Sequence, residues 1–139
     1  MLSRAIRATT WNAPALISAL VTGWIEDGTL AMSENKRRRE GAGHQRLCRE
    51  ILRDIPIVSH RHASFAWLPL PTGRRAEPIT ARLAAQGIAV STGEPFAVTD
   101  AMPQAMRLAL GGIARQELRI ALESIREAIN AAHESGNEN

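Results

Sequence analysis

Hydrophobic residues near the start of the chain recur at helical spacing. They follow each other at intervals of four along two adjacent ridges, which are Leu16, Leu20 and Trp24, and Ile17, Val21 and Ile25. This spacing is typical of a helix that buries a wide apolar stripe. Asn12 is a suitable N-cap residue and Pro14 is favourable in the first turn. Gly28 can adopt the left-handed conformation that ends a helix. We therefore expect a helix from about residue 13 to 27.

A second helical pattern runs from Thr29 to Leu52, with hydrophobic residues on one side and arginines elsewhere. Gly41 and Gly43 lie inside it, and each glycine costs about 1 kcal/mol relative to alanine within a helix. The pattern therefore predicts either one long helix that bends at the glycines or two helices that meet there. Pro56 ends the segment.

The middle of the chain changes to the pattern of short strands. Four runs are expected as strands: Ile57–Ser59, Phe65–Leu70, Ile88–Val90 and Met106–Leu110. The prolines in the second run suit a strand end or a sheet edge.

One helix is expected between these strands, around residues 76–86. It follows a turn at Thr72 and Gly73, turns Ile79 and Leu83 inward, and is capped by Gly87. Residues 91–95 are expected as a loop that leads to Phe96.

The clearest pattern is the last one, from about Arg115 to His133. Spacings of three and four separate its hydrophobic residues Leu118, Leu122, Ile125 and Ile129. The order of elements predicts an α+β fold: a small, largely antiparallel sheet covered by helices on one face and preceded by two N-terminal helices. Residues 134–139 are expected to fray.

Composition places the chain among ordinary globular domains. It has 139 residues, of which 45% are hydrophobic and 22% charged, so we expect one soluble domain. Its single cysteine, Cys48, cannot form a disulfide within the chain, which favours a reducing compartment, the cytoplasm. The apolar stretch from Ala13 to Ile25 is shorter than the roughly 20 residues that span a bilayer, so no membrane is expected.

Positive charge is carried almost entirely by arginine, because Lys36 is the only lysine. A Schiff base could therefore form only at Lys36, which lies in the polar run Glu34–Glu40. The formal net charge of +3 is too small to require nucleic acid. DNA binding through Arg37–Arg39 stays the weaker alternative to a solvated helix face.

Few residues carry a recognisable chemical pattern. His60 and His62 could hold a metal with a third ligand from His44, His133 or a carboxylate, but imidazoles that bond to the backbone are the favoured interpretation. Arg107 lies within an apolar strand, so it either points to solvent or lines a pocket where it binds a carboxylate or phosphate. No metal site is predicted.

Three stretches together resemble a known family. Residues 62–71, 84–96 and 106–111 resemble the C-terminal small domain of fold-type I aminotransferases, and more closely the aminotransferase-like domain of MocR-type transcriptional regulators of the GntR family. Residues 8–28 and 37–52 are similar to the two helices that precede that domain. The resemblance implies N-terminal helices over 1–54 that link to a large domain, an aminotransferase-like small domain over 55–133, and a tail over 134–139.

The resemblance also implies roles for particular residues. Arg107 matches the arginine that binds the α-carboxylate of an amino acid, and Gly93 to Phe96 matches a loop at the pocket edge. A turn anchored by Phe96 in the core is an equally good interpretation of that loop. The family uses pyridoxal phosphate, but the large domain supplies the aldimine lysine and most phosphate contacts. We therefore expect no cofactor on this chain alone and no catalytic residue.

Two functions follow as expectations. The favoured one is a non-catalytic aminotransferase-like domain, a truncated or split fragment that acts through association, either as a homo-oligomer (a dimer) or with a separate large-domain chain. The alternative is the carboxylate-binding half of a split aminotransferase, completed by a separate large-domain chain. In both cases the first two helices would leave apolar side chains bare. Binding of nucleic acid is not expected through this domain.

Overall fold

The computed structural model describes residues 14–98 and 104–134. The chain forms two compact units, Met1–Arg37 and Arg38–Asn139. The boundary expected after residue 54 therefore falls within the second unit.

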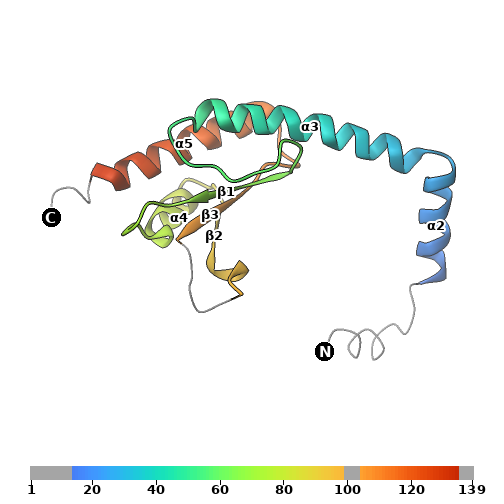
Figure 1. The fold of residues 1–139 in the computed structure, drawn as a ribbon, viewed down its shortest axis with the longest axis horizontal. Coiled ribbons are helices and arrows are strands. Elements are labelled where there is room, and N and C mark those ends of the chain that lie inside the picture. The colour runs from blue at the N-terminus through green and yellow to red at the C-terminus, as the bar shows by residue number, and fades with distance from the viewer. Residues whose placement is uncertain (1–13, 99–103, 135–139) are drawn as a thin grey trace. The chain divides into compact units, whose positions relative to one another are not determined.

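Figure 1 shows the elements, which are α2 (Ala15–Glu26), α3 (Thr29–Ile51), β1 (Phe65–Pro69), α4 (Ala76–Ala85), β2 (Ser91–Thr92), the 3-10 helix η1 (Glu94–Phe96), β3 (Ala105–Ala109) and α5 (Arg115–Glu134). The sheet has the order β1-β3-β2, and both strand pairs are antiparallel. The α+β class expected from the pattern is confirmed.

One face of the sheet is buried and the other is open. Ala66 and Leu68 of β1 lie opposite Leu108 and Met106 of β3, and all of them are buried. They pack in the core with buried side chains of the helices: Leu47, Cys48 and Ile51 of α3, Ile79 and Leu83 of α4, and Leu118, Leu122, Ile125 and Ile129 of α5. In Figure 1, α5 and the C-terminal part of α3 run along the same side of the sheet. The positions of α4 and α5 that were predicted to face inward are thus confirmed, as are Leu47 and Ile51 of α3.

The Gln45 amide ties α3 to the start of β1. Gln45 is 0% exposed, and its Nε2 donates to the carbonyl oxygens of Ala63 and Phe65, both at 2.9 Å. Its Oε1 accepts a hydrogen bond of 2.8 Å from the Ser59 hydroxyl. The amide is therefore satisfied in the core, as a buried polar group must be.

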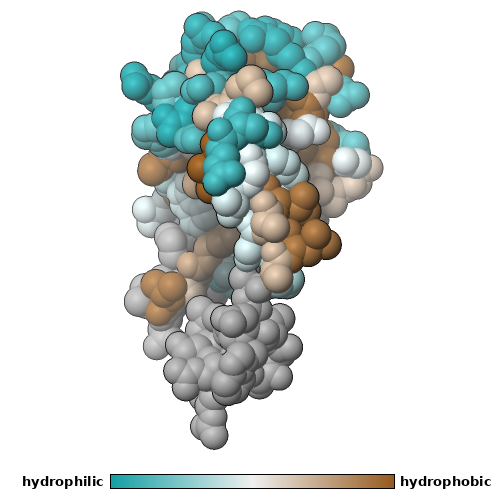
Figure 2. All heavy atoms as spheres, turned by 90° about the vertical axis from the view of Figure 1, so that its right-hand side faces the viewer, coloured by the Kyte–Doolittle hydropathy of each residue, from teal (hydrophilic) through white to brown (hydrophobic). Residues whose placement is uncertain are grey.

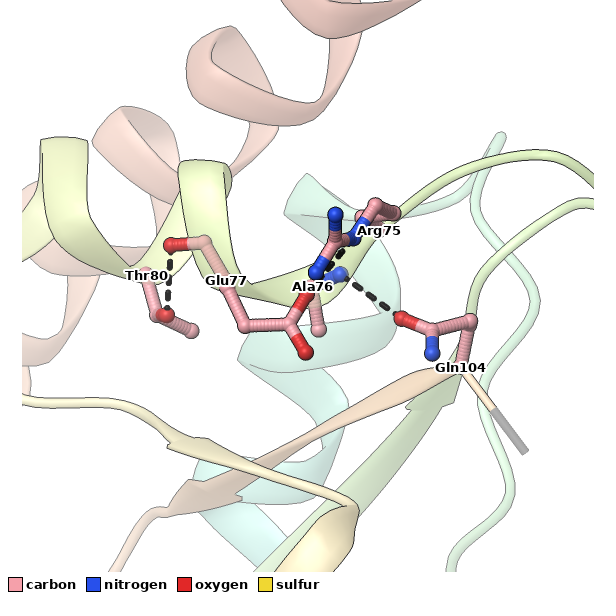
Figure 3. Close-up of polar contacts among 5 residues, drawn as sticks. All are labelled: Arg75, Ala76, Glu77, Thr80 and Gln104. Atoms are coloured by element: carbon pink, nitrogen blue, oxygen red, sulfur yellow. Dashed lines mark hydrogen bonds and ion pairs between the residues drawn. The ribbon is translucent and has the colours of Figure 1, made fainter. Parts of the chain in front are cut away.

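A carboxamide also ties α4 to the start of β3 (Figure 3). Gln104 Oε1 accepts a hydrogen bond of 3.0 Å from the backbone N–H of Ala76, the first residue of α4. The Thr80 hydroxyl donates to the carbonyl of Glu77 at 3.0 Å, and Arg75 forms an ion pair of 3.5 Å with the Glu77 carboxylate. Gln104 thus acts as a helix cap from outside the helix, which fixes α4 against the strand that carries Arg107.

In the first unit, α2 has no buried residue. Its predicted apolar ridges stay exposed, with Leu16 at 70% and Ile25 at 60%. Hydrophobic side chains also reach the surface in the view of Figure 2. The predicted helix is confirmed with slightly shorter bounds, and Gly28 has the expected positive φ of 80°. Asn12 lies outside the described residues.

Neither glycine interrupts α3, which is one helix of 23 residues. Gly41 is needed for another reason. A Cβ atom at position 41 would lie 2.6 Å from the carbonyl oxygen of His62. The loop before β1 therefore approaches the helix so closely that only glycine fits.

Two predicted strands are wrong. Ile57–Ser59 forms only one bridge, in which Val58 and Trp67 exchange backbone hydrogen bonds of 2.8 and 2.9 Å. Ile88–Val90 is not a strand, and the pairing with β3 begins instead at Ser91. The half-buried side chains of Ile88 and Val90 pack against the core from a loop. Their apolar pattern therefore reflects burial rather than strand pairing.

The two glycines of α3 offer a matched test of close packing. Gly41→Ala should destabilise the fold by about 1–3 kcal/mol, because the new methyl group collides with the His62 carbonyl. Gly43→Ala should stabilise it by about 0.5–1 kcal/mol, because helix propensity improves and the nearest neighbour of the new Cβ, an Arg115 nitrogen, is 3.8 Å away. Urea unfolding of both variants measures the difference. Equal shifts of the two midpoints would contradict the close approach.

Candidate functional site

Arg107 lies on the open face of the sheet, in the middle strand. Its register partners are Trp67 on β1 and Ser91 on β2, and directly opposed residues project to the same face. Met106 and Leu108, the neighbours of Arg107 along β3, point into the core. The strand period thus places the guanidinium on the face opposite the core.

Two aromatic rings flank the half-buried Arg107 side chain. Its guanidinium carbon is 5.0 Å from the ring centroid of Phe65 and 5.1 Å from that of Phe96. Trp67 packs edge-on against Phe96, with centroids 5.9 Å apart. Contacts of a cation with a ring face within about 6 Å are attractive. The rings therefore hold the guanidinium in place without neutralising its charge.

Arg107 makes no ion pair and no hydrogen bond with any residue in 14–98 or 104–134. A guanidinium has five N–H donors in a planar fork that matches a carboxylate or phosphate. The side chain is thus positioned by rings while its donors have no protein acceptor among these residues. Such an arrangement can bind a planar anion.

The two residues expected at the pocket edge lie in different surroundings. Phe96 is 47% exposed, so the interpretation that it anchors a turn in the core is wrong. Its ring lies on the open face beside Arg107 and Trp67. Phe96 is the last residue of η1, which begins two residues after β2 ends at Thr92, so only a short turn separates it from the strand beside Arg107.

Gly93 is buried and continues the ladder between β2 and β3. Its N–H donates to the Ala105 carbonyl at 2.8 Å, and its carbonyl accepts from the Phe96 N–H at 3.0 Å. The cavity beside it measures about 10 Å³, which is close to the space of one water molecule. Gly93 therefore shapes the turn that carries Phe96, and contact with a ligand stays a prediction.

The histidines bond to the backbone. The Nδ1 atoms of His44 and His62 lie 2.6 Å from the Leu110 carbonyl oxygen and 3.2 Å from the Arg38 carbonyl oxygen, respectively. His60 Nδ1 accepts a hydrogen bond of 3.3 Å from the His62 N–H. Within the part of the chain that the structure describes, no three His, Cys, Asp or Glu residues are grouped to hold a metal ion. The side chain of His133 lies outside that part.

The chain has one lysine and one cysteine, the two side chains that commonly act as nucleophiles toward an aldehyde. The only lysine, Lys36, is exposed on α3 and belongs to the other compact unit. Cys48 is 0% exposed, and burial raises the pKa of its thiol to about 11, opposed in part by Arg49. Cys48 is therefore a buried, protonated core thiol, and Lys36 belongs to the unit that does not contain Arg107.

Sequence reasoning found Arg107 and Phe96 but missed Phe65 and Trp67. Both lie on β1 two residues apart, so they share one face of the strand. Their alternation with the buried Ala66 and Leu68 was a usable signal. Their place beside Arg107 depends on the register between β1 and β3, which the spacing of residues does not specify.

Among the described residues, no helix is both long enough and apolar enough to cross a membrane. No protein-family model matches the sequence. No curated protein matches it either.

Solved structures of aminotransferases share the fold. An archaeal alanine:glyoxylate aminotransferase superposes with a TM-score of 0.75 at 16% identity, over 90% of this chain and 32% of its own. The α-aminoadipate aminotransferase of Thermus thermophilus gives 0.77 at 20% identity, over 94% of this chain and 35% of its own. The kynurenine aminotransferase of Pyrococcus horikoshii gives 0.68 at 18% identity, over 78% and 28%.

The chain therefore has the fold of one part of these aminotransferases. It spans about a third of the length of the first two. An α+β fold with a three-stranded antiparallel sheet is common to this chain and the corresponding part of those enzymes.

Proposed function

We propose that this chain is a non-catalytic, aminotransferase-like domain that binds a carboxylate at Arg107 and acts through association with another polypeptide. The observation that carries the proposal is the half-buried Arg107 guanidinium, held by Phe65 and Phe96 on the open sheet face. We further propose a relationship to MocR-type regulators of the GntR family. The resemblance of residues 62–71, 84–96 and 106–111 supports it.

Carboxylate binding follows from the chemistry of the guanidinium. Two parallel N–H groups can donate to the two oxygens of a carboxylate, and such charge-assisted pairs are short and oriented. Hydrogen bonds to charged groups contribute about 1.5–3 kcal/mol each. The rings limit the motion of Arg107, so less side-chain entropy is lost on binding. The Ser91 hydroxyl, opposite Arg107 in the register, is a further donor on this face.

The carboxylate site can be tested on the guanidinium signals of the labelled chain. Titration with acetate and with L-alanine should shift the Arg107 Nε–H resonance in the unmodified chain. Arg107→Gln should weaken binding about tenfold or more, because the charged fork is lost. Arg46→Gln removes the same charge from an exposed position on α3 and should leave binding unchanged. Equal losses in both variants would show nonspecific attraction and refute a site at Arg107.

A second function remains a candidate because the chain covers 28–35% of the length of the three enzymes compared. In that case Arg107 would orient the substrate of a split aminotransferase. Incubation with pyridoxal phosphate should give no stable internal-aldimine absorbance band that borohydride fixes to a specific residue. The exposed Lys36 amine accounts only for the weak, unsaturable labelling that any surface lysine shows. A complementary large-domain chain whose mixture transaminates, and whose activity is lost with Arg107→Ala, would favour the split enzyme instead.

Association is supported by the bare apolar ridges of α2, where Leu16 is 70% and Leu20 44% exposed. Large exposed apolar patches mark interaction surfaces. Sedimentation at several concentrations should show a dimer that dissociates on dilution. The double change Leu16→Gln and Leu20→Gln should shift the equilibrium to monomer, while Val98→Gln, at an exposed apolar residue of the other unit, should not. A monomer at every concentration would contradict self-association.

A further inference from the structure

An apolar groove lies where β2 stops short of covering β3. It encloses about 430 Å³. Its walls come from three elements of the second unit, and the residues that matter here are Ile88 and Val90 of the loop after α4, Ala109 of β3, and Glu117, Ile120 and Ala121 of α5. Ile120 is 55% exposed, so the groove presents apolar surface to solvent.

The backbone of β3 alternates between its two neighbours. Leu110 N–H donates to the Ser64 carbonyl at 2.7 Å on the β1 side, whereas the Ala105 carbonyl accepts from Gly93 N–H at 2.8 Å on the β2 side. Odd-numbered residues of β3 therefore point their N–H and C=O groups toward β2. Ala109 is one of them.

No residue of β2 reaches Ala109. The β2 ladder pairs Ser91 with Arg107 and Thr92 with Met106, so continuation of that register would bring Ala89 opposite Ala109. Ala89 instead lies in a loop. No backbone group of residues 14–98 or 104–134 completes the ladder there. The groove thus contains a short open sheet edge, and such an edge is a template for another strand.

The charge of the residues that line the groove restricts which peptide segments can bind there. Glu117 is the only ionisable residue among those that line the groove, and it forms no ion pair with the described residues. Most other lining residues are apolar. A segment that fits is therefore extended, apolar at alternate positions, and carries a cation at the end that lies beside Glu117.

We propose that this groove binds an extended segment of the partner polypeptide, which adds a strand to β3 at Ala109. The guest backbone pairs with the N–H and C=O of Ala109, its apolar side chains pack against Ile88, Val90 and Ile120, and its lysine or arginine faces Glu117. Strand addition of this kind takes affinity from main-chain hydrogen bonds and specificity from alternate side chains. The inference rests on the association part of the proposed function and names the chemistry of the partner.

The probe is a short capped peptide that alternates valine and threonine, made with a lysine at either end. Added to the full labelled chain, one of the two peptides should slow hydrogen exchange of the Ala109 amide at least about tenfold while the Ser91 amide keeps its rate. The same peptide with N-methylated backbone positions cannot pair and should give no protection. Protection by the N-methylated peptide would overturn strand addition.

Matched variants locate the contact. Ile120→Arg should weaken peptide binding about tenfold, because it replaces half-exposed apolar surface in the groove with a charge, and Glu117→Gln should abolish the preference for one lysine position. Val98→Arg, at a residue 97% exposed outside the groove, should leave the affinity unchanged. An Ile120→Arg variant that binds as tightly as the unmodified chain would overturn the proposal.

Further outcomes of these experiments distinguish the groove proposal from self-association and from the carboxylate site. Ala109 protection that rises with protein concentration in the absence of peptide would show that a second copy fills the edge, and would overturn a partner segment. If neither peptide protects Ala109 at millimolar concentration while acetate still shifts Arg107, the groove proposal fails and the carboxylate site stands. Protection of Ala109 without any response of Arg107 would refute only the carboxylate site.

Discussion

The buried Gln45 amide is the interaction on which the second unit depends. It is the only buried polar side chain among the described residues, and it bonds to two carbonyls at the start of β1 and to the Ser59 hydroxyl. An unsatisfied buried amide costs about 1–3 kcal/mol, so α3 and the chain before β1 must keep one relative position. The His62 carbonyl approaches Gly41 closely in the same contact between α3 and the chain before β1. The Gln45 hydrogen bonds and this close approach together fix the position of Phe65, the first residue of β1.

Because side chains alternate along a strand, residues that stabilise the core and residues that form the candidate site occupy alternate positions of β1 and β3. Ala66 and Leu68 of β1 and Met106 and Leu108 of β3 pack in the core against the helices. The residues between them form the open face together with Arg107. Phe65 is adjacent to the Gln45 contact and also touches the Arg107 guanidinium. The helix contact that stabilises the fold therefore also positions one wall of the candidate site.

The likeness to aminotransferases concerns the fold, and function depends on particular groups placed on a fold. In this chain the groups are an arginine between aromatic rings, an open sheet edge, and a helix whose apolar residues are exposed. Each of these features offers unpaired donors, unpaired backbone groups or exposed apolar side chains to which another molecule can bind. The carboxylate site and the groove differ in chemistry. The first offers the charged donors of Arg107, and the second offers apolar side chains and the unpaired backbone groups of Ala109.

The periodic parts of the chain were predictable from sequence. Residues Leu118 to Ile129 keep the spacing of a helix on a core, and Ala66 and Leu68 alternate as one face of a strand, because burial of one side imposes a period on the chain. Arg107 was identified for the same reason, as a charge within an apolar strand. Its two possible environments could not be separated without its neighbours.

Tertiary structure decided whatever depends on contacts between distant residues. Gly41 appears in the sequence as a helix breaker, but the His62 carbonyl makes it a site of close packing. Ile88–Val90 appears as a strand, but pairing with β3 begins only at Ser91. The sequence leaves Phe96 either at a pocket edge or in the core, and the turn after β2 places it beside Arg107. The spacing of hydrophobic residues indicates which side chains are buried. The register between strands and the direction of a turn depend on contacts with residues far away in the sequence, so the spacing does not specify them.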